Sequence, residues 1–252
     1  MAGFDLQSLL PFVMVGFLAQ IVDGALGMAF GLISNTLLVA VLGLTPAAGS
    51  ASVHLVEVFT TAASGISHAL HRNIDWKLFA RIAIPGVIGG IAGAYLLTHI
   101  DGSIAKPLVM AYLAAIGVYL LYRSRRSVQP HRQPKVIAPL GLVGGFLDAA
   151  GGGGWGPVVT SNLLLQGAVP RTTIGTVNAA EFVLTLAVSA TFIVEMGLTA
   201  FTVATCGLLI GGLAAAPVGA YLAKRVEPQR LLFLVGIVLT LTSLFSLYRA
   251  IA

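Results

Sequence analysis

The chain contains one pattern of residues twice, and this duplication constrains its fold more than any other feature. DGALGMAFG at 23–31 reappears as DAAGGGGWG at 148–156, an offset of 125 residues. SVH with a following Glu at 52–57 reappears as TVN with a following Glu at 176–181, an offset of 124 residues. Because the offset is nearly constant, the sequence predicts two halves that share one fold.

The composition indicates a membrane protein. Hydrophobic residues make up 57% of the 252 residues and charged residues 9%, whereas a soluble domain has about 25% charged residues. Several apolar runs reach the roughly 20 residues that a helix needs to cross a bilayer. The 14 Lys and Arg residues lie mainly in the loops, where they set orientation. We therefore expect an all-α polytopic protein in the lipid bilayer, with no nucleic acid as a partner.

Each half contains three long apolar spans and one interrupted segment. The spans are expected at 47–70, 78–98, 104–123, 172–194, 199–222 and 230–250. The interrupted segments, 8–44 and 137–168, split at glycines into pieces of roughly 13–16 residues, too short for a full crossing. We expect each to be a broken or re-entrant helical segment. The predicted domains are an N-terminal repeat at 1–123, a basic cytoplasmic linker at 124–135 and a C-terminal repeat at 136–252.

The distribution of positive charge predicts the topology. If the linker is cytoplasmic and each interrupted segment returns to the side it entered, twelve Lys and Arg lie inside and two, Lys106 and Arg249, lie outside. Each half then crosses three times, so the second half is inverted relative to the first. The alternative has eight full crossings and parallel repeats. It places the loop around Arg72 on the side opposite Arg171.

The glycine-rich breaks are candidate substrate sites. Glycine-interrupted segments paired in two halves are a pointer to a transporter's binding site. The helical pieces that follow begin near Met28 and Trp155, so their free N–H groups and dipoles favour an anion. The alternative is close packing of membrane helices on glycine. The candidate cradle consists of Gly24, Gly27, Gly151, Gly152, Gly153 and Gly154.

Four duplicated carboxylates and one histidine are candidates for coupling. Asp23 and Asp148 stand beside the breaks, where they either carry a coupling proton or cation or cap the backbone. Glu57 and Glu181 follow His54 and Asn178 by three residues, which places each pair on one helix face. A buried carboxylate must be paired or protonated, so His54, Glu57 and Glu181 are expected to carry protons. A structural hydrogen bond between the halves is the alternative.

Further polar side chains follow the breaks and could donate hydrogen bonds to an oxyanion. Besides Asn178, the candidates are Ser34, Asn35, Thr160, Ser161 and Asn162. The alternative for them is hydrogen bonding back to their own helix. No HExxH, CxxC or P-loop pattern is present, so we expect neither an enzyme nor a metal or cofactor. The histidines at span ends, His68, His71 and His99, are interpreted as membrane-interface residues.

The duplicated motifs resemble those of the sulfite exporter TauE/SafE family of membrane permeases. The resemblance covers about 8–250 and rests on the two Asp-Gly-rich breaks and the two Pro-to-Glu blocks at 46–57 and 170–181. It implies transport, often outward, of sulfur-containing anions such as sulfite or organosulfonates across the plasma (inner) membrane of a prokaryote. We expect a proton- or ion-coupled carrier working by alternating access around a midplane site. A passive anion channel, or a permease for another small anion, and a homodimeric assembly stay open.

Overall fold

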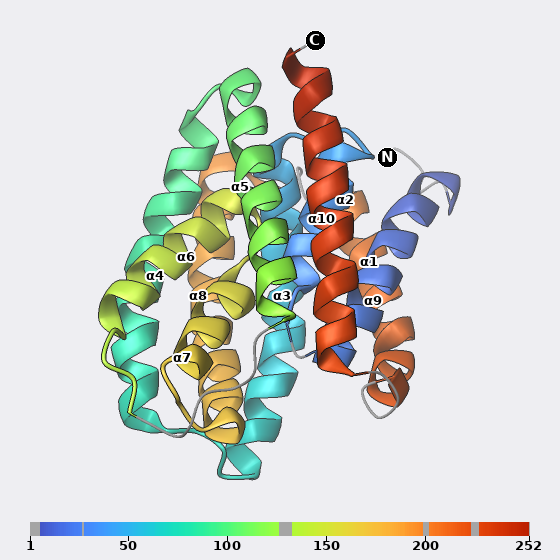
Figure 1. Cartoon of the computed structure of the whole chain (residues 1–252). Helices are drawn as coiled ribbons and strands as arrows, with labels where there is room; N and C mark the ends of the chain where they lie inside the picture. The colour runs from blue at the N-terminus through green and yellow to red at the C-terminus, as the bar shows by residue number, and fades with distance from the viewer. Residues whose placement is uncertain (1–5, 27, 126–132, 199–201, 223–226, 252) are drawn as a thin grey trace.

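The computed structural model describes residues 6–26, 28–125, 133–198, 202–222 and 227–251, and within these ranges it contains helices and no strand (Figure 1). The first half contains α1 (Leu6–Leu26), α2 (Phe30–Ala40), α3 (Pro46–Leu70), α4 (Trp76–His99) and α5 (Gly102–Arg123). The second half contains α6 (Ala138–Gly151), the π-helix η1 (Gly156–Thr160), α7 (Ser161–Leu165), α8 (Pro170–Met196), α9 (Thr202–Leu222) and α10 (Pro228–Ile251).

The six predicted spans are present as α3, α4, α5, α8, α9 and α10, each within three residues of the expected ends. By length and hydropathy, α4, α5 and α8 can cross a membrane. The interrupted segments also break where expected, and α2 with 11 residues and α6 with 14 are too short to cross alone. The expected length is wrong for the first piece, since α1 has 21 residues. The prediction of an all-α polytopic membrane protein is confirmed.

Both breaks depend on backbone conformations with positive φ. The second break runs through Gly152, Gly153 and Gly154, whose φ angles are 72°, 140° and 140°. Residues with a Cβ rarely adopt these angles, which explains the glycine run. At the first break the positive φ falls on Ala29, at 93°. The glycine-rich sequence therefore ends one helix and changes the direction of the chain before the next helix begins.

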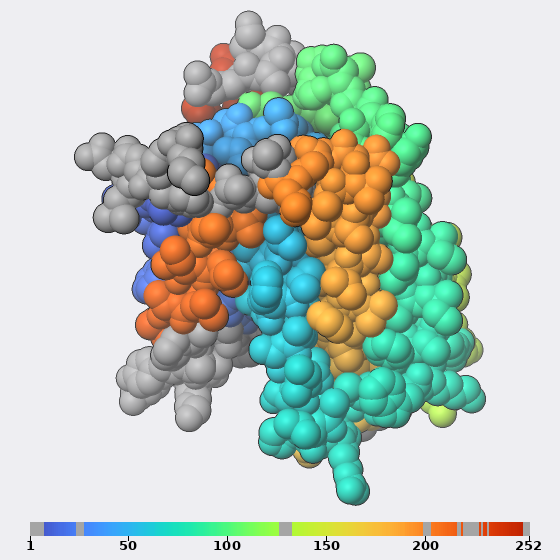
Figure 2. Space-filling model, turned by 180° about the vertical axis from the view of Figure 1, so that it is seen from behind, coloured from blue at the N-terminus to red at the C-terminus, as the bar shows by residue number. Residues whose placement is uncertain are grey.

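Each half supplies helices that pack on the other half. α1, which precedes the first break, packs along α9. Its counterpart α6, which precedes the second break, packs along α4, on the opposite side of the bundle in Figure 1. The counterparts α5 and α10 pack together, as do α3 and α8. Seen from behind, α3 lies between α9 and α8 (Figure 2). The duplication in sequence thus extends to the pairing of helices in space.

Polar contacts bring several loops to one end of the bundle. The Gln166 side chain, just after α7, accepts hydrogen bonds from the backbone of Lys135 and Val136, just before α6, at 2.9 and 3.0 Å. The second interrupted segment therefore enters and leaves at the same end. Arg171 donates to Asn73 at 2.7 Å, whereas parallel repeats would put the loop beside Asn73 on the far side. This favours inverted repeats, although inversion of the whole halves and the domain boundaries stay predictions.

Glycines allow α4 and α6 to approach until their backbones touch. A Cβ on Gly145 of α6 would overlap the carbonyl oxygen of Gly86 on α4, and a Cβ on Gly89 would overlap that of Leu142. Small residues at helix interfaces are the usual means of close packing in membranes. The interface that holds the second broken segment therefore has no room for a larger residue.

Replacing Gly145 with valine should destabilise the protein, because the side chain would separate α4 from α6. Overpacking of this kind costs about 1–3 kcal/mol, and a lower melting temperature in detergent would report it. Gly102→Val is the matched control, since nothing lies within 4 Å of the Cβ position at Gly102. Equal melting temperatures for the two variants would contradict the described interface.

Candidate functional site: an acidic cavity at the helix breaks

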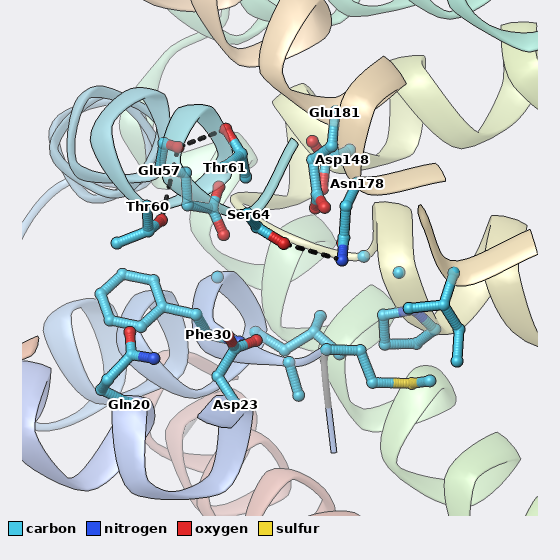
Figure 3. A pocket seen from close by; sticks show the side chains of 18 of the residues that line it. Gln20, Asp23, Phe30, Glu57, Thr60, Thr61, Ser64, Asp148, Asn178 and Glu181 are labelled. Carbon is cyan, nitrogen blue, oxygen red and sulfur yellow. Dashed lines mark hydrogen bonds between the residues drawn. The ribbon is translucent and has the colours of Figure 1, made fainter. Parts of the chain in front are cut away.

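A cavity of about 310 Å³ lies between the two halves, where both breaks meet (Figure 3). Gly153 of the second break packs against the backbone of Gly31 and Leu32 just after the first, with no space for a Cβ. The lining comes from both halves and is about half polar. It includes Gln20, Asp23, Phe30, Gly31, Glu57, Thr60, Thr61, Ser64, His68, Asp148, Gly154, Gly156, Asn178 and Glu181.

The two duplicated aspartates make the same backbone contact. Asp23 Oδ1 accepts the N–H of Phe30 at 3.1 Å, and Asp148 Oδ1 accepts the N–H of Trp155 at 2.8 Å. Each carboxylate therefore reaches seven residues ahead, across its break, to the start of the next helical piece. This is the capping role considered from the sequence, and it occupies an amide that was predicted to face the anion. Both aspartates also line the cavity.

Asp148 makes a second contact that its counterpart does not share. Its Oδ2 lies 3.0 Å from Nε2 of His54, and both side chains are buried. Nδ1 of His54 lies 2.8 Å from the Ser50 carbonyl oxygen, and the Ser50 hydroxyl donates to the Ala149 carbonyl at 2.7 Å. These contacts tie α3 of the first half to the end of α6 in the second.

The two predicted glutamates face the cavity. The Glu57 carboxylate lies against the backbone amide of Gly31 at the start of α2, and Glu181 extends from α8. With Asp23 and Asp148, four carboxylates line one cavity, whereas its described lining contains neither Lys nor Arg. Four ionised carboxylates at such close range would repel one another strongly in a medium of low dielectric constant. The site therefore requires protons, a cation or both.

Other predicted binding residues lie behind the cavity wall. Asn35 is fully buried, and its Nδ2 donates to the Gly151 carbonyl at 2.7 Å, which fastens α2 to the second break. Asn162 donates back to Val158 in its own segment at 2.6 Å, as the alternative expected. The remaining candidates outside the described lining are Ser34, Gly151, Gly152, Gly153, Thr160 and Ser161. Gly27 lies outside the described residues, and the surroundings of Gly24 are not described either. A substrate contact for these residues stays a prediction.

Several lining residues were not predicted. Thr60, Thr61, Ser64 and His68 follow Glu57 on α3 at intervals that keep them on one helix face. This polar stripe is visible in the sequence and could have been read as a cavity wall. Asn178, which was predicted, donates from Nδ2 to the Ser64 hydroxyl at 3.1 Å across the two halves (Figure 3).

Substitution of Ser64 with phenylalanine should block transport, because the ring would enter the cavity and displace the Asn178 amide. We expect uptake to fall at least about tenfold, which corresponds to a loss of 1.4 kcal/mol or more. Ala63→Phe is the matched control, since Ala63 is exposed on the same helix and lies outside the described lining. Uptake that is normal in Ser64→Phe would mean that substrate takes another route.

A helical membrane bundle with broken helices from two repeats around a polar central cavity has the architecture of a membrane permease. The family model described as "Sulfite exporter TauE/SafE" matches residues 12–246, and the chain belongs to this family. It is also similar to the "Probable membrane transporter protein YtnM" of Bacillus subtilis (strain 168). The two are 41% identical over 245 residues, which cover 92% of this chain and 80% of that protein. The protein is therefore a membrane transporter and not an enzyme, as the sequence predicted.

Proposed function

We propose that this protein is a secondary transporter that exports small sulfur-containing anions, such as sulfite or organosulfonates, together with protons. The family description names sulfite export. The cavity, at about 310 Å³, is at the small end of ligand pockets and suits a compact anion. The Ser64 hydroxyl and the second N–H of the Asn178 amide line it and can donate to oxyanion oxygens.

The observation that carries proton coupling is the set of four carboxylates in the cavity. A bound anion a few ångströms from ionised carboxylates would be repelled by several kilocalories per mole at the effective dielectric constant of a protein. Protonation of the carboxylates removes this repulsion and turns each of them into a hydrogen-bond donor. Anion and protons therefore bind together rather than in competition.

Transport of one proton with each sulfite anion agrees with export. A sulfite dianion that moves with one proton carries a net charge of −1. An inside-negative membrane potential drives that charge outward with about 2.3 kcal/mol per 100 mV. Export of the anion then needs no inward proton gradient. The accompanying proton lowers the net charge that moves, and so lowers the free energy that the membrane potential contributes.

The same geometry supports alternating access. α4 packs along α8, whereas α3 and α9, which occupy the matching positions, touch over a much shorter length. The cavity reaches His68 near the end of α3 and Ile174 near the start of α8, at the end of the bundle that carries Arg171. By the positive-inside rule this end, with the basic linker, is cytoplasmic in the plasma membrane of a prokaryote. The described arrangement is then the inward-open state.

The direct test is the flux of radiolabelled sulfite in proteoliposomes that contain a pH-sensitive dye, at fixed membrane potential. We expect saturable sulfite flux, competition by organosulfonates and a proton movement that depends on sulfite. Flux that passes chloride equally well and moves no protons would instead identify a passive anion channel. Absence of sulfite flux, with transport of another small anion, would overturn the substrate assignment.

A further inference from the structure

The neighbours of the buried contact between His54 and Asp148 fix the positions of its hydrogens. Nδ1 of His54 lies 2.8 Å from the Ser50 carbonyl oxygen, which can only accept a hydrogen bond. The Ser50 hydroxyl lies 3.3 Å from the same nitrogen, but it lies 2.7 Å from the Ala149 carbonyl and has one proton to give. The shorter contact takes that proton. Nδ1 must therefore carry its own hydrogen.

The second ring nitrogen then lacks a donor. A neutral imidazole has one N–H, so with Nδ1 protonated, Nε2 presents a lone pair. It faces Oδ2 of Asp148 at 3.0 Å, and an ionised carboxylate offers only lone pairs. Oδ1 of the same carboxylate is already occupied by the Trp155 N–H. Two acceptors at this distance would repel, so the contact requires one more proton between them.

We propose that the His54–Asp148 contact holds one excess proton and that this is a proton carried with the substrate. The proposal rests on the proposed function and deepens it, because it assigns the coupling to one pair of atoms. Asp148 lines the cavity, so water there can take the proton directly. After its loss, neutral His54 and ionised Asp148 face each other with two lone pairs. The link between α3 and the second break then weakens.

Ionisable and aromatic groups from four helices surround this contact. The carboxylates that face the cavity around Asp148 are Glu57 on α3, Glu181 on α8 and Asp23 on α1. From α5, the Tyr112 hydroxyl donates to the Gly153 carbonyl, and from α8, Phe192 packs on His54 with ring centroids 6.2 Å apart. The excess proton therefore lies within a cluster of acidic groups, at the 3.0 Å contact between His54 Nε2 and Asp148 Oδ2.

The matching position in the other half cannot hold such a proton. Asn178 stands where the repeat has His54, and Asp23 stands where it has Asp148. The Asn178 amide does not titrate, and it donates to Ser64 rather than to a carboxylate. The two-fold arrangement is therefore broken at one residue, so this device supplies one proton per cycle rather than two.

The first experiment observes the proton without transport. Histidines labelled with ¹⁵N in nanodisc-embedded protein are measured by NMR, with the His54 signal assigned from a His54→Asn variant, and infrared spectra detect a protonated carboxyl group. We expect either a doubly protonated His54 or a protonated Asp148 at neutral pH. A neutral His54 with its hydrogen on Nε2, next to an ionised Asp148, would overturn the proposal.

Asp148→Asn provides the test of coupling. The amide oxygen can still accept from Trp155 and the amide nitrogen can donate to Nε2 of a neutral His54, so the geometry is kept and the excess proton is lost. We expect this variant to carry sulfite with one proton fewer per anion, whereas Asp23→Asn, the matched control, leaves the ¹⁵N signature of His54 in place. An unchanged proton-to-sulfite ratio in Asp148→Asn would overturn the coupling role. A wild-type protein that shows the excess proton but moves no sulfite would instead contradict the proposed substrate.

Discussion

Replacing Asp148 with alanine should nearly abolish transport while the protein still reaches the membrane. The change removes the partner of the Trp155 N–H and the partner of His54 Nε2, and both groups are buried. Each buried polar group left without a partner costs about 1–3 kcal/mol. Because 1.4 kcal/mol corresponds to a factor of ten, we expect at least about a 25-fold loss of sulfite flux, measured in proteoliposomes at equal protein content.

Asp23→Ala is the comparison for this variant. Its side chain has the same cap, to Phe30, but lacks the histidine contact. We therefore expect a smaller loss of flux in Asp23→Ala than in Asp148→Ala. Equal losses would show that the caps alone matter, and an unimpaired Asp148→Ala would contradict the whole account of the second break.

The second large effect is expected when Glu57 and Glu181 are both changed to glutamine. In the wild-type protein, flux should rise as the pH falls, because protonation removes the repulsion between carboxylates and anion. Glutamine mimics the protonated form at every pH. The double variant should therefore have a much flatter pH profile than the wild type between about 4 and 8, where carboxylates and imidazoles titrate. The response that remains comes from the His54–Asp148 contact, which the two substitutions leave in place. The measurement is initial sulfite flux against pH.

Glu195→Gln is a suitable control for this pair. Glu195 lies near the end of α8, 3.8 Å from His99, and its side chain is partly exposed outside the described lining of the cavity. This variant should keep the wild-type pH profile. A pH response that survives unchanged in the Glu57 and Glu181 double variant would remove these residues from the coupling mechanism.

Much of the fold could be predicted because membranes make local sequence informative. A long apolar run must form a helix to satisfy its backbone, so the spans that became α3 and α8 were visible from length alone. The breaks were visible because glycine interrupts apolar runs. Pairing was not predictable, since α1 packs on α9 through contacts between segments far apart in the chain.

Site residues could be predicted where the duplication made them stand out. They could be predicted less well where tertiary contacts decide which way a side chain faces. Asp23, Glu57, Asp148 and Glu181 stand out because they recur in apolar surroundings, and all four reach the cavity. Asn35 stood out equally, yet it faces Gly151, because its direction depends on how α2 packs on the second half. Sequence spacing gives the helix face of a residue but not which neighbour covers that face.

The exchange of partners between halves has a consequence for biosynthesis. α1 leaves the ribosome well before its main packing partner α9, which is made only after α8 is complete. Until then α1 and the short helix α2 lack their final neighbours. Contacts between distant segments slow folding because a long loop must close before they form. The two halves are therefore synthesised one after the other but reach their final structure together, which makes the insertion machinery or the lipid the temporary partner of the first half.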